Sequence, residues 1–226
     1  MDFLALCQRT AAECAIPNSS FASVTGQTGI KADIVRWVNM AYEDIQRDSI
    51  EWYFRQADKS FSTIANVAQY VTQMTDVSAI NKDTVTLDTA HLIQLPYLDF
   101  KYLYEGATTQ TGKPIHYAVA PDNSFRVGPT PDTVYTISFQ YSTKVASLAN
   151  NTDTPIIPAE YHMAIVWKAA AHFAGYEESG FQYQIFNDKY KELFSRLYRE
   201  QRVTIGTTGQ ALGDNTITNA GFWQYI

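Results

Sequence analysis

Residues 158–202 have the sequence PAEYHMAIVWKAAAHFAGYEESGFQYQIFNDKYKELFSRLYREQR, and this stretch decides the fold. Apolar residues recur at three- and four-residue steps on both sides of Ser179-Gly180, which predicts two amphipathic helices joined by a tight turn. Pro158 suits the first helical position, because the N–H that it lacks has no partner there. The apolar stripes of the two helices consist of Tyr161, Ile165, Ala169, His172 and Tyr176, and of Tyr183, Phe186, Tyr190, Leu193 and Leu197. Such an αα-hairpin needs further helices to cover its apolar faces.

The N-terminal 50 residues supply two more helices. Asp2 is a capping residue for the first helix, and the second helix is predicted from about Ile30 to Ile50. The apolar faces of the two helices are formed by Phe3, Cys7, Ala11 and Cys14, and by Ile34, Val38, Ala41 and Ile45. Packing residues 1–50 against residues 156–202 predicts an antiparallel helical bundle made from the two ends of the chain.

Residues 51–155 have the character of a β-rich insertion in this bundle. Short stretches rich in aromatic and β-branched residues predict strands, at 52–54, 60–64, 70–72, 84–87, 116–119, 125–127 and 135–141. A short helix is predicted at 97–104. The last strands are separated by Pro- and Gly-containing turns, which predicts an antiparallel meander with one face in solvent. The expected fold class is therefore α+β, with residues 203–226 as an extended C-terminal tail.

Composition limits the classes of function. The chain has 226 residues and a formal net charge of −6 without any basic run, which argues against binding of nucleic-acid backbones as its main activity. Fifteen tyrosines suit either a protein-contact surface or a Tyr-rich core and sheet. Cys7 and Cys14 are about 10 Å apart along one helix, too far for a disulfide within it, so we expect free thiols in a reducing cytoplasm. We expect neither a signal peptide nor a membrane span.

No pattern of catalytic, cofactor-binding or metal-ligating residues emerges. The four histidines, His91, His116, His162 and His172, form no spaced pair with one another or with Cys or Glu that is typical of a metal site. We expect His172 to be a satisfied core histidine and His162 to bond a neighbouring loop carbonyl. The adjacent acids Glu43/Asp44 and Glu177/Glu178 are expected at the solvated surface, and Asp88 beside His91 is the best remaining acid–base pair. The sequence gives no positive support for an enzyme.

The chain ends in an aromatic cluster on a Gly-, Thr- and Asn-rich segment. We predict that this cluster docks on a partner; its residues are Phe222, Trp223, Tyr225 and Ile226. The alternative is that the tail packs back on its own domain.

Scattered positions over about residues 1–200 resemble the head–tail adaptor (connector) proteins of tailed bacteriophages, akin to tail tubular protein A and the head-completion adaptors. The similar segments are 24–29, 34–46 with Trp52 and Phe54, 125–141, and 158–178. The resemblance implies a structural virion protein whose fold is a helical bundle with a β-rich part.

The resemblance also implies partners and a location. Such adaptors form a homo-oligomeric ring, commonly a dodecamer, under the portal, and the ring carries the DNA channel toward the tail. The expected partners are further copies of the chain, the portal protein, a tail or nozzle protein and DNA that passes without sequence-specific binding. The expected location is the virion neck, after assembly in the host bacterial cytoplasm. A portal-docking role for Phe222, Trp223, Tyr225 and Ile226 is our own inference.

Two other classes stay open at this point. One is a tail-tube or tail-completion subunit, and the other is a virion-associated cell-wall hydrolase.

Overall fold

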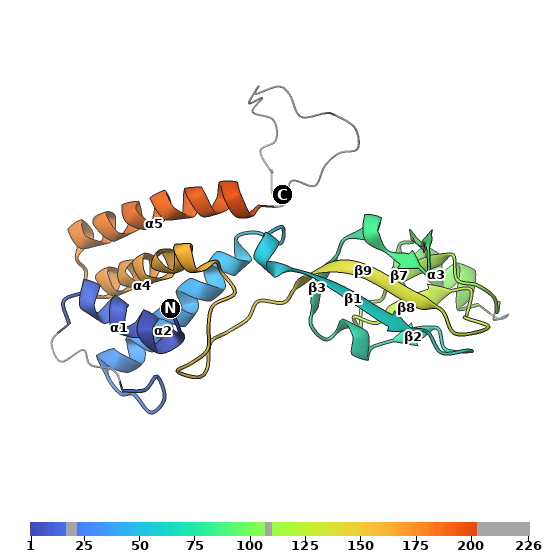
Figure 1. The fold of residues 1–226 in the computed structure, drawn as a ribbon, viewed down its shortest axis with the longest axis horizontal. Coiled ribbons are helices and arrows are strands. Elements are labelled where there is room, and N and C mark those ends of the chain that lie inside the picture. The colour runs from blue at the N-terminus through green and yellow to red at the C-terminus, as the bar shows by residue number, and fades with distance from the viewer. Residues whose placement is uncertain (17–21, 107–109, 203–226) are drawn as a thin grey trace, which may run out of the picture.

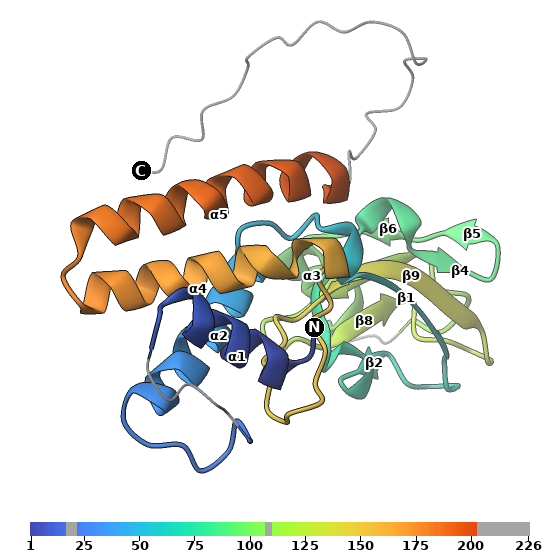
Figure 2. The same cartoon turned by 60° about the vertical axis from the view of Figure 1, so that its left-hand side comes forward.

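The computed structural model describes residues 1–16, 22–106 and 110–202, and these form a mixed α+β fold, which confirms the predicted class. Helices α1, α2, α4 and α5 lie together on one side of the molecule, and the strands and α3 lie on the other (Figures 1 and 2). The helices are α1 (Phe3–Glu13), α2 (Ile30–Arg47), α3 (Tyr97–Tyr104), α4 (His162–Tyr176) and α5 (Gly180–Gln201). None of the helices in the described ranges is long and apolar enough to cross a membrane.

The first two helices form where the sequence predicts them. The carboxylate of Asp2 accepts a hydrogen bond from the backbone N–H of Ala5 at 2.8 Å, which confirms it as the cap of α1. The four predicted inner residues of α2 are fully buried. Helix α2 ends at Arg47 rather than near Ile50, and the chain then turns toward the strands.

The predicted α4–α5 hairpin is present, but its buried surface differs from the prediction. Tyr161, Ile165 and Ala169 are buried, whereas Tyr176 is exposed and His172 is half-buried, so the predicted stripe is wrong at its C-terminal end. Pro158 precedes a 3-10 turn, Ala159–Tyr161, and the α-helix starts only after it, later than predicted. In α5, Phe186 and Leu197 are the buried residues, because α4 supplies most of the surface that covers this helix.

Helices from both ends of the chain contribute to one hydrophobic core. Phe3 and Leu6 from α1, Trp37 from α2 and Ile165 from α4 belong to the same buried cluster, and Leu197 from α5 closes it. Cys7 is buried and Cys14 half-buried, and both are free, as predicted; burial raises the pKa of each thiol to about 12.

The strands form two sheets that pack on each other. The strands are β1 (Gln56–Ser62), β2 (Gln69–Tyr70), β3 (Val77–Ile80), β4 (Thr86–Leu87), β5 (Ala90–His91), β6 (Ile93–Gln94), β7 (His116–Val119), β8 (Phe125–Gly128) and β9 (Thr136–Thr143). In the first sheet β9 is central: it pairs with β1 on one side and with β3 and β4 on the other, and β5 follows β4. The second sheet has the order β2-β8-β7-β6.

The predicted meander of 116–141 is therefore wrong in its last step. Strands β7 and β8 form a hairpin, but β9 belongs to the other sheet. The linker between them contains Pro129 and Pro131, which have no N–H for a strand ladder, so the chain leaves the first pair and crosses over. The rings of Phe125 and Phe139 stack across the two sheets with centroids 5.6 Å apart.

The alternation predicted for β9 is confirmed, because Ile137, Phe139 and Tyr141 are buried between the sheets. Two further details differ from the prediction. The β6–β7 pair is parallel in otherwise antiparallel sheets. The aromatic stretch 52–54 forms no strand; it leads into a 3-10 turn, Tyr53–Arg55, at the start of β1.

Candidate interaction surfaces

The four histidines lie in four separate environments. The Nε2 atom of His162 lies 2.9 Å from the carbonyl oxygen of Ile157, which confirms the predicted bond to a neighbouring loop. The prediction for His172 is wrong: this residue lies at the edge of the helical core, and its Nε2 has no hydrogen-bond partner among the described residues and is 4.0 Å from Asp44. His116 pairs with the hydroxyl of Tyr104 at 2.6 Å, and His91 is exposed.

Asp88, which the sequence pairs with His91 as a candidate acid–base pair, has a structural role. The Asp88 carboxylate accepts the backbone N–H of Thr136 at 3.0 Å and so ties the turn between β4 and β5 to β9. Glu177 and Glu178 are exposed, as predicted. Among the described residues, no group of three or more His, Cys, Asp or Glu side chains is placed to hold a metal ion.

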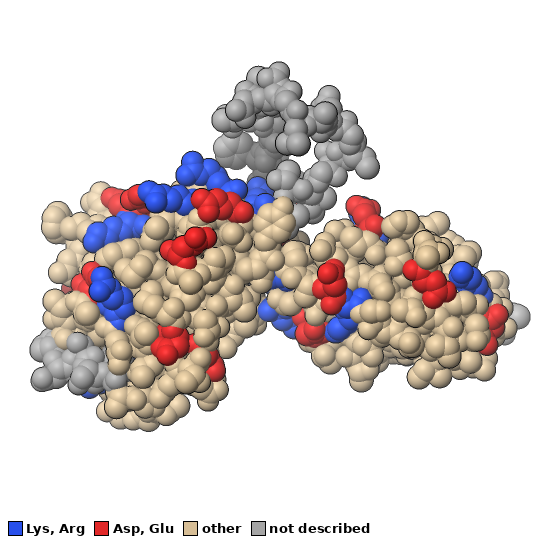
Figure 3. Space-filling model, viewed as in Figure 1, with Lys and Arg blue, Asp and Glu red and all other residues tan. Residues whose placement is uncertain are grey.

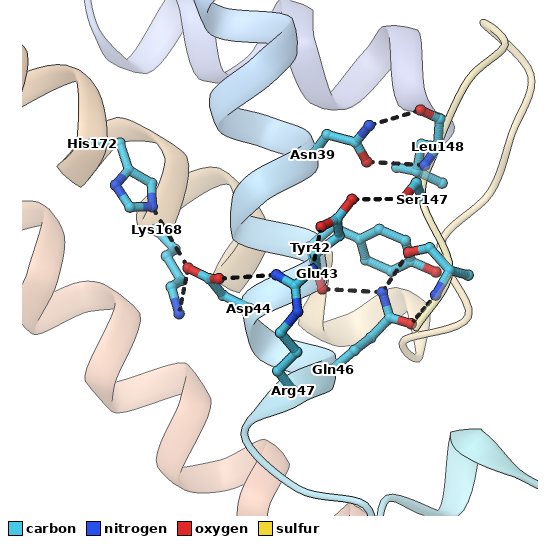
Figure 4. A network of polar contacts seen from close by, with 11 residues as sticks. Asn39, Tyr42, Glu43, Asp44, Gln46, Arg47, Ser147, Leu148, Lys168 and His172 are labelled. Atoms are coloured by element: carbon cyan, nitrogen blue, oxygen red, sulfur yellow. Dashed lines mark hydrogen bonds and ion pairs between the residues drawn. The ribbon is translucent and has the colours of Figure 1, made fainter. Parts of the chain in front are cut away.

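One edge of α2 binds the return segment, which we define as residues 144–157, in the manner of a neighbouring strand. The side-chain amide of Asn39 donates to the carbonyl of Leu148 and accepts from its N–H, both at 2.9 Å. One full heptad later, Gln46 makes the same pair of bonds with Ala146 at 2.8 and 2.9 Å. Figure 4 shows these amides on one side of α2, one above the other, with Ser147 between them. These two side chains thus make the backbone hydrogen bonds that a neighbouring strand would make in a sheet.

Glu43 lies between the two amides on the same edge of α2 and also binds the return segment. It accepts the hydroxyl proton of Ser147 at 2.6 Å and pairs with Arg47 at 2.7 Å, so it is not the freely solvated residue that the sequence predicts. The bond from Ser147, supported by Arg47, lowers the pKa of Glu43. Three consecutive residues of the return segment, Ala146, Ser147 and Leu148, are therefore hydrogen-bonded to α2.

The opposite edge of α2 binds the C-terminal hairpin through Asp44. Its carboxylate lies 3.5 Å from the ammonium of Lys168, 3.6 Å from Arg47 and 4.0 Å from His172 (Figure 4). Burial is the main cause that lowers the pKa of His172, which favours its neutral form. Glu43 and Asp44, adjacent in sequence, thus tie α2 to two different parts of the chain.

A buried arginine joins the helices to the sheets. Arg55 is 2% exposed, and its guanidinium donates to the carbonyls of Gln46 at 2.7 Å and Ser49 at 3.1 Å, at the end of α2. It also donates to the carbonyl of Thr143, the last residue of β9, at 3.2 Å from Nε and more closely from Nη2. The indole N–H of Trp52 donates to Ile45 at 2.9 Å beside it. This junction fixes the direction in which β1 leaves α2.

The sequence predicts no contact role for Asn39, Gln46 or Arg55. Asn39 and Gln46 lie seven residues apart on α2, so the two amides share one edge of the helix. That spacing is the signal that could have indicated the binding edge. Their partners are backbone groups about a hundred residues away, which no local pattern specifies.

Many large apolar side chains are exposed in the described ranges, and two of the elements that carry them are α5 and α3. The first is α5, where Phe181 is 78% exposed. Charged side chains of both signs lie along this helix (Figure 3). The second is α3, where Tyr102 is 87% exposed and Leu98 and Leu103 are also exposed. Exposed aromatic and aliphatic groups of this kind favour contacts with other proteins.

A cavity of about 260 Å³ lies where the outer face of the first sheet meets the end of α2. Its walls come from the α2–β1 connection and from β1, β3 and β9. The lining residues are Ile50, Glu51, Gln56, Ala79, Ile80, Asn81, Lys82, Asp83, Gln140 and Ser142. Glu51 also pairs with Arg202, the last described residue, at 2.9 Å. The predicted docking residues Phe222, Trp223, Tyr225 and Ile226 lie outside the described part of the chain.

A family model described as SU10 adaptor protein matches residues 1–211, a range that takes in every described helix and strand. A search of curated proteins finds no match.

Proposed function

This chain belongs to the SU10 adaptor protein family, a family of phage head–tail adaptors, and on that basis we propose that it forms a ring joining the portal to the tail. The match over residues 1–211 is the observation that carries the proposal, because it covers the helical part, the β-rich part and the connections between them. Membership of this family supports a structural rather than an enzymatic role.

The ring would contain twelve copies and continue the DNA channel from the portal. A chain with a net charge of −6 suits a channel wall, because weak repulsion of phosphates lets DNA pass without sticking. The ring would be part of the virion neck, assembled in the host cytoplasm, with the portal on one side and a tail or nozzle protein on the other.

Within this ring we divide the chain into three parts. Residues 1–50 and 156–202 would act as one helical bundle, residues 51–155 as a β-rich insertion, and residues 203–226 as an extended tail that docks on the portal through Phe222, Trp223, Tyr225 and Ile226. The buried Arg55 supports this division, since it fixes the insertion at one angle to the helices. A fixed angle in every copy is what a closed ring requires.

Light scattering coupled to size-exclusion chromatography tests the proposal. We expect the purified chain to be a monomer or a loose oligomer, and to become a ring of fixed size when purified portal is added. A fixed ring without portal would contradict the portal-dependent step, and no ring under either condition would contradict the function. Crosslinking in virions separates this role from that of a tail-tube subunit, because an adaptor must crosslink to the portal.

A further inference from the structure

Arg202, the last described residue, lies beside the cavity at the α2–sheet junction. Its guanidinium pairs with the carboxylate of Glu51 at 2.9 Å, and Glu51 is one of the residues that line the cavity. The backbone of Arg202 also forms an antiparallel bridge with Trp52. These two contacts fix the point from which the next residues of the chain start.

The bridge also limits the direction of the segment that follows. In an antiparallel pair the two chains run in opposite directions, so an extended continuation from Arg202 would bring Val203 opposite Glu51 and Thr204 opposite Ile50. Ile50 and Glu51 both line the cavity. An extended continuation of the chain would therefore run along the cavity wall.

The cavity suits apolar side chains. Most of the surface that faces it is apolar, and its aliphatic residues are Ile50, Ala79 and Ile80. Ile50 is 55% exposed, although it lies at the junction of the helices and the sheets. At about 260 Å³ the cavity is smaller than the pockets that hold whole small-molecule ligands. An apolar segment that covers these residues would gain the free energy of removing their surface from water.

The sequence directly after Arg202 supplies such a segment. Val203-Thr204-Ile205 consists of three β-branched residues, which favour an extended strand, and Gly206 follows them. Successive side chains of a strand point to opposite faces, so Val203 and Ile205 would share one apolar face and Thr204 would have the other. At about 3.3 Å per residue, Ile205 stays within roughly 10 Å of Arg202.

We propose that Val203 and Ile205 fill the junction cavity of their own molecule, where they pack on Ile50, Ala79 and Ile80. Position selects this occupant, because the chain itself delivers the segment to the cavity wall. Chemistry selects it too, because both side chains are branched and apolar, like the wall. The contact forms within a single copy and does not depend on the proposed ring.

This contact gives the C-terminal tail a fixed origin. Residues 203–205 would join the end of α5 to the end of α2 and to β3, which contributes Ala79 and Ile80 to the wall. The remaining residues, 206–226, would then leave the molecule at a defined point beside the first sheet. A partner that binds the aromatic cluster at the end of the tail would act on the sheet as well as on α5.

Disulfide trapping within the purified chain tests the contact. The double variant Ala79→Cys/Ile205→Cys should form an intramolecular disulfide, which mass spectrometry of tryptic peptides detects with and without reductant. The matched control is Ala79→Cys/Thr204→Cys, because residue 204 has the same reach and belongs to the opposite face. Its yield should be lower by about fivefold or more. Equal yields from the two double variants, or no disulfide in either, would overturn the contact.

A mixing experiment separates the chain's own segment from that of a second copy. The single variants Ala79→Cys and Ile205→Cys, with tags of different mass, should give no disulfide-linked heterodimer when they are mixed and oxidised. A heterodimer yield equal to the intramolecular yield of the double variant would show that the cavity binds the segment of another copy, and would overturn the proposal.

Thermal unfolding provides a second measurement. Ile205→Ser should lower the melting temperature by about 4 °C or more, because an apolar side chain is lost from a buried place. Thr204→Ser is the control and should change it by less than about 1 °C. An unchanged melting temperature for Ile205→Ser would overturn the proposed packing. All three experiments use the purified chain without portal, so their failure would leave the proposed ring standing.

Discussion

The side-chain amide of Gln46 makes both backbone hydrogen bonds of Ala146, a residue one hundred positions later in the chain, at 2.8 and 2.9 Å. Gln46 is fully buried, so neither group has water as an alternative partner. The return segment from the sheets is thereby held against α2 at a defined register. Asn39 repeats the arrangement with Leu148 seven residues earlier on the helix.

The first prediction concerns this bond pair. Gln46→Leu should lower the free energy of unfolding by about 2 kcal/mol, because the part-buried N–H and carbonyl of Ala146 lose their partners. Urea denaturation measures the change. Gln184→Leu on the exposed side of α5 is the control, and it should change stability by less than about 0.5 kcal/mol. Equal effects of the two variants would contradict the structural role of Gln46.

The second prediction concerns the junction. Arg55→Met should destabilise the fold by roughly 3 kcal/mol, because three carbonyl groups lose their donor. Arg55→Lys should rescue only part of this loss, since an ammonium group cannot reach all three carbonyls as the guanidinium does. Thermal unfolding measures both. The control Arg36→Met removes a surface pair with Asp33 and should have little effect; full rescue by lysine would contradict the forked geometry.

The elements that the sequence predicts are those whose signals are local. Helix α2 follows from the spacing of Ile34, Val38 and Ala41, and the inner face of β9 follows from strict alternation. The sheet to which a strand belongs depends on partners far away in sequence. The crossing between β8 and β9 was therefore missed, although Pro129 marks the place where the ladder must break.

The candidate surfaces depend even more on tertiary structure. The periodic stripe of α5 predicts buried residues along the helix, yet Tyr183 is exposed, since the neighbouring helices do not cover it. Ser142 has the same unremarkable sequence context as Ser138, and only the meeting of β9 with the end of α2 makes it a cavity residue. Burial of this kind is a property of the assembled fold.

The third prediction concerns pH. Burial is the largest cause that lowers the pKa of His162 below its usual 6.5, so the unfolded chain binds a proton more readily than the folded one. Stability should therefore be full above about pH 6.5 and fall as the pH drops from there toward the lowered pKa of the folded state. His162→Gln should flatten this dependence in denaturation curves between pH 8 and pH 5.

Two controls make the pH experiment specific. His91→Gln changes an exposed histidine and should leave the wild-type slope intact. Burial also lowers the pKa of His172, so a smaller slope should remain in His162→Gln and disappear in the double variant with His172→Gln. A wild-type slope that survives in the double variant would show that other groups cause it.

The last prediction concerns the C-terminal residues. Deleting residues 222–226 removes Phe222, Trp223 and Tyr225, and should weaken binding to purified portal about tenfold or more, because buried aromatic anchors carry much of the energy of an interface. The melting temperature should stay unchanged, since the described helices and strands end before this segment. Gln224→Ala is the matched control and should bind like the full chain. If the truncated protein binds portal as tightly as the full chain, the docking surface lies elsewhere. A truncated protein that also melts early would show that these residues pack on their own domain.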